Sequence, residues 1–105
     1  MLTREGARLQ VFLKLRRTLG LRRGPQEIVI LDHRVIERPW VWVFPWTTRG
    51  WLNGDDRYLL AGGGPILINR HDCSMRFAGS GRPLNFYIER YEAEVAGRER
   101  AEPGV

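Results

Sequence analysis

The most apolar stretch of the chain covers residues 38–46 and holds three of its four tryptophans. At the two-residue period of a β-strand, one face carries Trp40, Trp42, Phe44 and Trp46, and the other carries Val41 and Val43. A strand with two apolar faces is typical of the centre of a sheet that is covered on both sides. Pro39 and Pro45 lack the amide hydrogen that strand pairing needs, so they mark the ends of this strand or a bulge.

Helical spacing of apolar residues predicts one helix near each end of the chain. Thr3 suits the N-cap of a helix that runs to Leu19 and stops at Gly20. The apolar residues of this helix form one broad arc, which predicts a single buried face: Leu9, Val11, Phe12, Leu13, Leu15 and Leu19. A second helix begins at Pro83 and ends near Ala96, with a tight apolar stripe formed by Leu84, Tyr87, Ile88, Tyr91 and Val95. Phe86 falls off this stripe and has no assigned role.

Between the two helices, the pattern predicts short strands separated by turns. Residues 27–37 are rich in Ile and Val and predict a strand before the tryptophan-rich one. Residues 47–58 contain turn-forming residues and predict a loop, in which Trp51 and Leu52 dip back onto the core. Two further short strands and their connecting turn follow at residues 66–78. The order predicts an α+β fold, in which an N-terminal helix and a C-terminal helix pack on an antiparallel sheet of about four strands.

Length and composition favour one small globular domain. Of the 105 residues, 43% are hydrophobic and 10% aromatic, which are values of a folded chain. We expect the domain to cover residues 1–96 and residues 97–105 to form a frayed polar tail. No apolar run approaches the roughly 20 residues of a membrane span, and arginines interrupt the apolar residues of the N-terminus, unlike in a signal peptide. The sequence therefore predicts a cytoplasmic protein without a membrane partner, with which its single cysteine is consistent.

The net charge of +5 is concentrated in and just after the first helix. Residues 4–23 contain one acidic residue, Glu5, and these basic ones: Arg4, Arg8, Lys14, Arg16, Arg17, Arg22 and Arg23. A basic face of this kind binds nucleic acid or an acidic partner, or is simply a solvated helix face. The solvated face is the favoured interpretation, because charge runs alone are weakly specific.

The residues that carry reactive groups do not form a recognisable active site. Cys73 and His71 are two positions apart, but no motif supplies the orienting group and oxyanion hole that a cysteine nucleophile needs. Two histidines and one cysteine show no zinc-ligand spacing. The turn Gly62-Gly63-Gly64-Pro65 lacks the sequence and the following helix of a phosphate-binding loop. Asp55 and Asp56 suit a turn better than acid–base catalysis. We therefore expect no enzymatic activity, no metal and no cofactor.

Four segments of the chain occur in the order and spacing of a known family. They are Pro39-Trp40-Val41-Trp42-Val43-Phe44, Leu60-Ala61-Gly62-Gly63-Gly64-Pro65-Ile66-Leu67-Ile68-Asn69, Ala78-Gly79-Ser80, and Pro83-Leu84 with Tyr87-Ile88 and Tyr91-Glu92. Over about half of the chain they resemble the YrhB-type domain, also called the immunity protein 35 family of bacterial polymorphic-toxin systems. The resemblance places the family's hallmark tryptophan on Trp42 and its GGxP-like signature on Gly62, Gly63, Gly64 and Pro65, and implies that these residues are architectural. Family members tend to have glycine where Cys73 stands, so we expect another turn type there.

The resemblance also implies a function. Proteins of this kind are similar to antidotes that bind a toxin made by the same cell or a sibling and occlude it stoichiometrically. The toxins encoded beside the family often resemble papain-like cysteine peptidases or deamidases, so the implied partner is a cognate protein toxin. We place candidate contacts in the exposed loop, at Trp51, Asp55, Asp56 and Arg57.

Three alternatives remain open at this point. The first is a basic nucleic-acid-binding module, against which the aromatic strand argues because no basic residues alternate with its aromatic ones. The second is a chaperone-like housekeeping protein. The third is an enzyme that uses Cys73 as its nucleophile.

Overall fold

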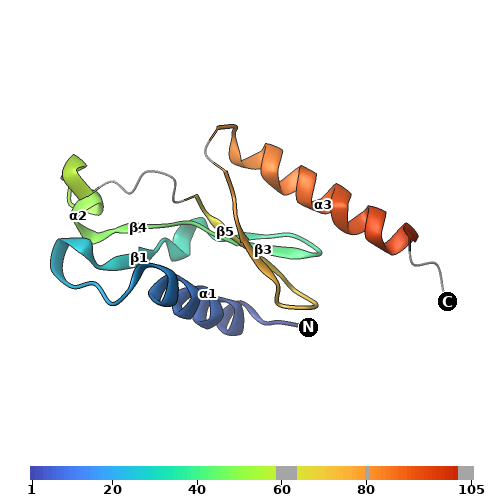
Figure 1. The fold of residues 1–105 in the computed structure, drawn as a ribbon, viewed down its shortest axis with the longest axis horizontal. Coiled ribbons are helices and arrows are strands. Elements are labelled where there is room, and N and C mark those ends of the chain that lie inside the picture. The colour runs from blue at the N-terminus through green and yellow to red at the C-terminus, as the bar shows by residue number, and fades with distance from the viewer. Residues whose placement is uncertain (59–63, 80, 102–105) are drawn as a thin grey trace.

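The computed structural model of the chain describes residues 1–58, 64–79 and 81–101. Its strands form a layer between two helices (Figure 1). Helix α1 (Arg4–Leu19) packs on one side of this layer and helix α3 (Leu84–Ala101) packs on the other. The predicted α+β fold, with a helix near each end and antiparallel strands between them, is confirmed.

The strand layer contains a four-stranded antiparallel sheet and a two-stranded ribbon. The sheet has the order β2-β3-β5-β6, formed by β2 (Ile36–Glu37), β3 (Val41–Phe44), β5 (Ile66–Asn69) and β6 (Met75–Phe77). The ribbon pairs β1 (Ile28–Ile30) with β4 (Trp46–Thr48). The short helical turns η1 (Gly24–Gln26) and η2 (Asp32–Arg34) lie before and after β1.

Both long strands predicted from the sequence are divided in the structure. The prediction of one strand over residues 27–37 is wrong, because η2 separates β1 from β2 and sends them to different partners. The tryptophan-rich stretch divides at Pro45 into β3 and β4, as its missing amide hydrogen allows. The Pro45 carbonyl accepts a hydrogen bond from the Leu31 amide, which continues the β1–β4 pairing past Ile30 and Trp46.

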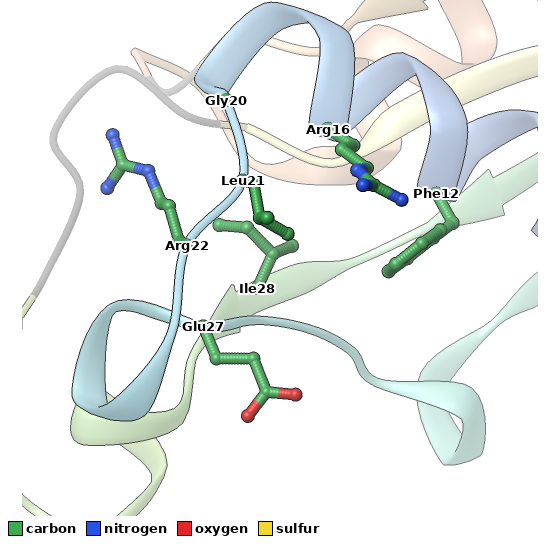
Figure 2. Close-up of a pocket in the computed structure, with 7 residues that line it drawn as sticks. All are labelled: Phe12, Arg16, Gly20, Leu21, Arg22, Glu27 and Ile28. Carbon is green, nitrogen blue, oxygen red and sulfur yellow. The ribbon is translucent and has the colours of Figure 1, made fainter.

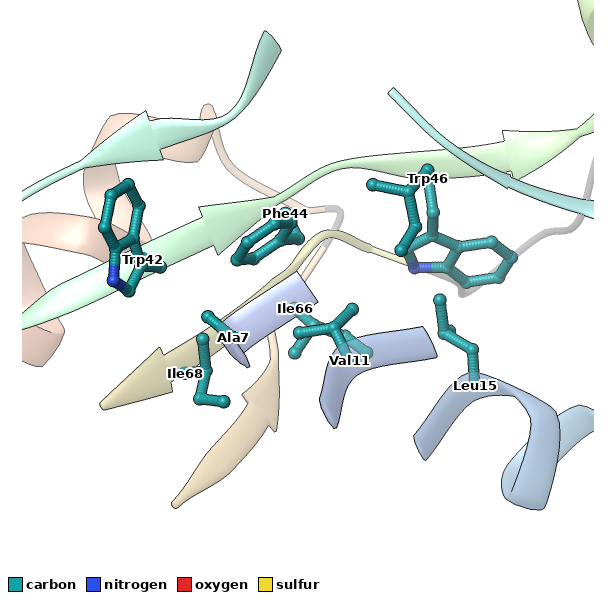
Figure 3. Packing of buried hydrophobic residues seen from close by; sticks show 9 residues of the cluster. Ala7, Val11, Leu15, Trp42, Phe44, Trp46, Ile66 and Ile68 are labelled. Carbon is teal, nitrogen blue, oxygen red and sulfur yellow. The ribbon is translucent and has the colours of Figure 1, made fainter. Parts of the chain in front are cut away.

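Each face of β3 belongs to a separate apolar cluster. The α1-side cluster consists of buried residues from α1 and four strands, which are Ala7, Val11, Leu15, Ile30, Trp42, Phe44, Trp46, Ile66 and Ile68 (Figure 3). The α3-side cluster consists of Val41, Val43, Leu67, Ala78, Ile88, Tyr91 and Val95. The predicted central strand with two buried faces is therefore confirmed. Trp40 is the exception, because it lies in a bend before β3 and packs, partly buried, on the α3 side.

Helix α1 buries a narrower stripe than its sequence suggests. The Thr3 hydroxyl accepts a hydrogen bond from the Gly6 amide as the N-cap, and Gly20 ends the helix at φ 81°. The buried residues of α1 are spaced four apart, at Ala7, Val11 and Leu15. The prediction of one broad buried arc is wrong, since Leu9, Phe12 and Leu13 are 58%, 37% and 44% exposed. A straight helix meets a sheet along one line, so Leu9 and Leu13 remain exposed and Phe12 lies at the flank of the contact, near the start of β1.

Helix α3 buries the stripe that its spacing predicted. Leu84, Tyr87, Ile88, Tyr91 and Val95 all belong to the α3-side cluster or pack against it. The helix continues past Ala96 and includes residues 97–101, so the predicted helix end is too early. Residues 102–105 lie outside the described residues, and the domain boundary at residue 96 stays a prediction. Phe86 is 39% exposed, with its ring edge-on to Tyr87 at 5.3 Å between centroids.

The turn between β5 and β6 holds Cys73 at φ 63°, in the left-handed region. The Cys73 amide donates to the Asn69 carbonyl at 3.0 Å. The side-chain oxygen of Asn69 accepts hydrogen bonds from the amides of His71 and Asp72, which fixes the turn from inside. The expected change of turn type is wrong, because Cys73 itself adopts the backbone conformation that favours glycine.

We expect Cys73→Gly to raise the free energy of unfolding by about 0.5–1 kcal/mol. Glycine removes the strain of the left-handed backbone, but it also increases the entropy of the unfolded chain, which offsets part of the stabilisation. Urea denaturation measures the change, provided that both proteins have the same m-value. Cys73→Ser keeps the Cβ atom and serves as the control with little change. A glycine variant no more stable than the serine variant would contradict the strain.

Candidate interaction surfaces

The predicted contact residues Trp51, Asp55, Asp56 and Arg57 lie in or beside α2 (Arg49–Leu52) and η3 (Asp56–Tyr58). Helix α2 occupies one end of the molecule, away from α3 (Figure 1). The Thr48 hydroxyl accepts from the Trp51 amide at 3.2 Å, and donates to the Tyr58 carbonyl at 2.7 Å. This single side chain therefore caps α2 and ties η3 to it.

Helix α2 directs its apolar side chains outward. Trp51 is 38% exposed and Leu52 is 48% exposed, so the prediction that both dip back onto the core is wrong. The inward position of this one-turn helix is taken by Gly50, where an added Cβ would lie 2.4 Å from the Tyr58 ring. Because the backbone of Gly50 packs against the Tyr58 ring, the neighbouring Trp51 side chain stays exposed on the surface.

Asp55 and Arg57 form a closed ion pair on the same segment. The Asp55 carboxylate accepts from two nitrogens of the Arg57 guanidinium, the shorter distance being 2.6 Å. These hydrogen bonds hold the pKa of Asp55 below its ordinary value. Asp56 and Arg57 are exposed. The Asp55–Arg57 pair therefore has no net charge, and Asp56 adds one negative charge beside it. The assignment of these four residues as partner contacts stays a prediction.

A second exposed surface lies on α1 and was missed in the sequence. Leu9, Phe12, Leu13 and Arg16 have the i, i+3, i+4, i+7 spacing of one helix face, and we refer to them as the α1 outer face. It points away from the stripe that α1 packs on the strands. Leu21, just after the helix, is 63% exposed and extends the apolar character.

A small pocket adjoins the α1 outer face. It has a volume of about 120 Å³ and lies between the C-terminal half of α1 and the start of β1, lined by Phe12, Arg16, Gly20, Leu21, Arg22, Glu27 and Ile28. Figure 2 shows Leu21 and Ile28 next to each other, with Phe12 and Arg16 on the α1 side. Small-molecule sites have volumes of roughly 300–1,000 Å³, so this pocket suits one apolar side chain of a larger partner.

The charges around α1 fall into a paired group and a free group. Arg8 donates two hydrogen bonds to the Asp32 carboxylate, at 2.7 and 3.1 Å, and Arg4 donates to the Asp32 carbonyl. The hydrogen bonds from Arg8 lower the pKa of Asp32. Within the described residues, Arg16 and Arg17 form no ion pair. The free positive charge therefore lies at the C-terminal half of α1, next to the pocket.

Of the motif residues that the structure describes, Trp42 and Gly64 are buried and Pro65 is partly buried. Trp42 is 6% exposed, and its indole nitrogen donates to the Leu2 carbonyl at 3.3 Å. The indole nitrogen of Trp46 donates to the buried Gly64 carbonyl at 2.9 Å, and the Pro65 carbonyl accepts from the Ala78 amide at 2.7 Å. These contacts join the segment just before β5 to β4 and to the end of β6. Gly62 and Gly63 lie outside the described residues.

The reactive side chains are not assembled into a catalytic or metal site in the described part of the chain. The His71 ring lies against Trp40, with 4.4 Å between centroids, and no hydrogen bond there joins it to Cys73. Among the same residues, no group of three His, Cys, Asp or Glu side chains is placed to hold a metal ion. None of the described helices is long and apolar enough to cross a membrane.

Comparison with known proteins identifies the class to which this small α+β domain belongs. A family model described as immunity protein 35 matches residues 7–94, which places the chain among the immunity proteins. Within that class, the chain belongs to the immunity protein 35 family. No curated protein and no solved structure matches the chain.

Proposed function

We propose that this immunity protein neutralises one cognate protein toxin by binding it stoichiometrically and covering its working cleft. The observation that carries the proposal is the family match, which spans residues 7–94 and so includes every described strand, all of α2 and most of α1 and α3. The toxin that we propose is a papain-like cysteine peptidase or a deamidase, met in the cytoplasm of the cell that makes the immunity protein.

The architecture supports a binding mechanism without turnover. Two apolar clusters and a network of backbone and side-chain hydrogen bonds hold the exposed faces of α1 and α2 in place. A preformed surface loses little conformational entropy on binding, so more of its contact energy becomes affinity. Occlusion also needs no catalytic group.

The test is co-expression and titration with the product of the adjacent reading frame. We expect the two proteins to co-purify in a one-to-one complex, growth to be restored, and the toxin's activity to reach zero at one equivalent. Neutralisation at a small fraction of an equivalent would contradict occlusion, because it requires turnover. Cys73→Ser is the matched control and retains full protection if the thiol has no chemical role. Failure of the two proteins to bind would remove the proposal.

A further inference from the structure

We propose that the α1 outer face and its adjoining pocket form the surface that docks the toxin, and that they receive an acidic segment carrying an apolar side chain. This inference rests on the proposed immunity function and specifies which face of the molecule performs it.

The first argument is the amount of apolar surface on α1. The helix already buries Ala7, Val11 and Leu15 against the strands, which is the one apolar stripe that a surface helix needs. Leu9 and Leu13 form a second apolar stripe on the opposite side, at 58% and 44% exposure. Folding gains little from side chains this exposed. A contiguous exposed apolar patch rimmed by polar groups is typical of a protein-binding site.

The second argument is the pocket beside this stripe. Its apolar wall comes from Phe12, Leu21 and Ile28, and its charged lining residues are Arg16, Arg22 and Glu27, of which Glu27 is paired with Arg49 (Figure 2). Well-packed pockets that accept one anchor side chain are where interfaces concentrate their binding energy. A flat apolar stripe beside such a pocket offers both contact area and a fixed register.

The third argument is charge. Arg8 is neutralised by Asp32, whereas Arg16 and Arg17 have no acidic partner among the described residues. Their uncompensated charge lies beside the apolar stripe and attracts an acidic surface, which also accelerates association. The surface around α2 lacks this attraction, because Asp55 and Arg57 pair with each other and the exposed Asp56 adds a negative charge.

The same features disfavour the other occupants of the α1 outer face. A second copy of the chain would bring Arg16 and Arg17 against similar charges, which is unfavourable. Nucleic acid gains nothing from Leu9 and Leu13 at the centre of the face, since leucine neither donates hydrogen bonds nor stacks on bases.

The experiment measures binding of the purified product of the adjacent reading frame to four forms of this protein by calorimetry. The test variant is Leu9→Glu with Leu13→Glu, which places negative charge on exposed positions, and we expect affinity to fall at least about 100-fold. The control is Phe86→Glu on α3, an apolar residue that is 39% exposed, and we expect its affinity to stay within about threefold of wild type. Thermal unfolding of both variants checks that they fold.

A charge-reversal variant keeps the inference testable if the leucine variant does not fold. Arg16→Glu with Arg17→Glu changes two exposed residues without a described ion pair, and we expect association to slow at least about tenfold and its salt dependence to reverse or vanish. A folded leucine variant or charge-reversal variant that binds like wild type would overturn the docking surface and leave the proposed function standing.

Two further outcomes are decisive. A wild-type protein that does not bind the product overturns the proposed function and the docking surface together. The second outcome is that the wild-type protein instead uses Leu9 and Leu13 to bind duplex RNA, vesicles of phosphatidylserine and phosphatidylcholine, or a second copy of itself. Any of these results would contradict the proposal that the α1 outer face binds a toxin. Size-exclusion chromatography identifies self-association.

Discussion

Trp42→Ala lowers the free energy of unfolding by about 3–5 kcal/mol, a large part of the stability of a domain of this size. The indole is 6% exposed and lies in the α1-side cluster, where it contacts Phe44 at 6.5 Å between ring centroids (Figure 3). The Arg70 guanidinium covers it at 4.9 Å from the ring centroid, and its nitrogen donates to the Leu2 carbonyl. Alanine removes all three contacts and leaves a cavity between α1 and β3.

Chemical denaturation followed by circular dichroism measures this loss, because the signal does not depend on the removed tryptophan. Trp51→Ala is the matched control. It deletes the same side chain from a position that is 38% exposed, so it lowers the free energy of unfolding by about 1 kcal/mol or less. Equal losses in the two variants would show that Trp42 is not a core residue in solution.

Gly64→Ala lowers the free energy of unfolding by about 3 kcal/mol or more, through overlap with the backbone. A Cβ at this position would lie 2.0 Å from the Ala78 carbonyl oxygen and 2.9 Å from its carbon. Two hydrogen bonds prevent the backbone at Gly64 from moving away from Ala78. The Gly64 carbonyl accepts from the buried Trp46 indole, and the next residue, Pro65, accepts from the Ala78 amide. Moving Gly64 away from Ala78 therefore weakens both hydrogen bonds.

Gly97→Ala provides the control for this steric effect. Gly97 lies within α3 and an added Cβ meets nothing within 4 Å, so alanine raises the free energy of unfolding by about 0.5–1 kcal/mol. Thermal unfolding of the two variants in parallel gives a lower melting temperature for Gly64→Ala and a higher one for Gly97→Ala, each compared with wild type. A Gly64→Ala protein as stable as wild type would mean that the close approach to Ala78 does not exist in solution.

The candidate surfaces differ in how far local sequence could reveal them. The segment with Trp51 and Arg57 was found because an aromatic residue among turn-forming ones is conspicuous. The α1 outer face was missed because Leu9 and Leu13 fall within the same wide arc as Val11 and Leu15. Helical spacing shows that a face is apolar, but it does not show where along that arc a sheet makes contact. The uncovered part of the arc becomes visible once the strands are in place.

Local spacing was enough to predict a helix near each end of the chain, the Thr3 cap, the Gly20 stop and the burial of β3 on two faces. These features depend on the spacing of neighbouring residues and on hydrogen bonds within one turn, so they are local. Tertiary structure decided that residues 27–37 divide between two sheets, that Trp51 points outward and that Cys73 stays left-handed. Each of these features depends on contacts between segments that are distant in the sequence, or on the geometry of a whole hairpin. The pattern of neighbouring residues does not show which of several segments a strand or loop will contact.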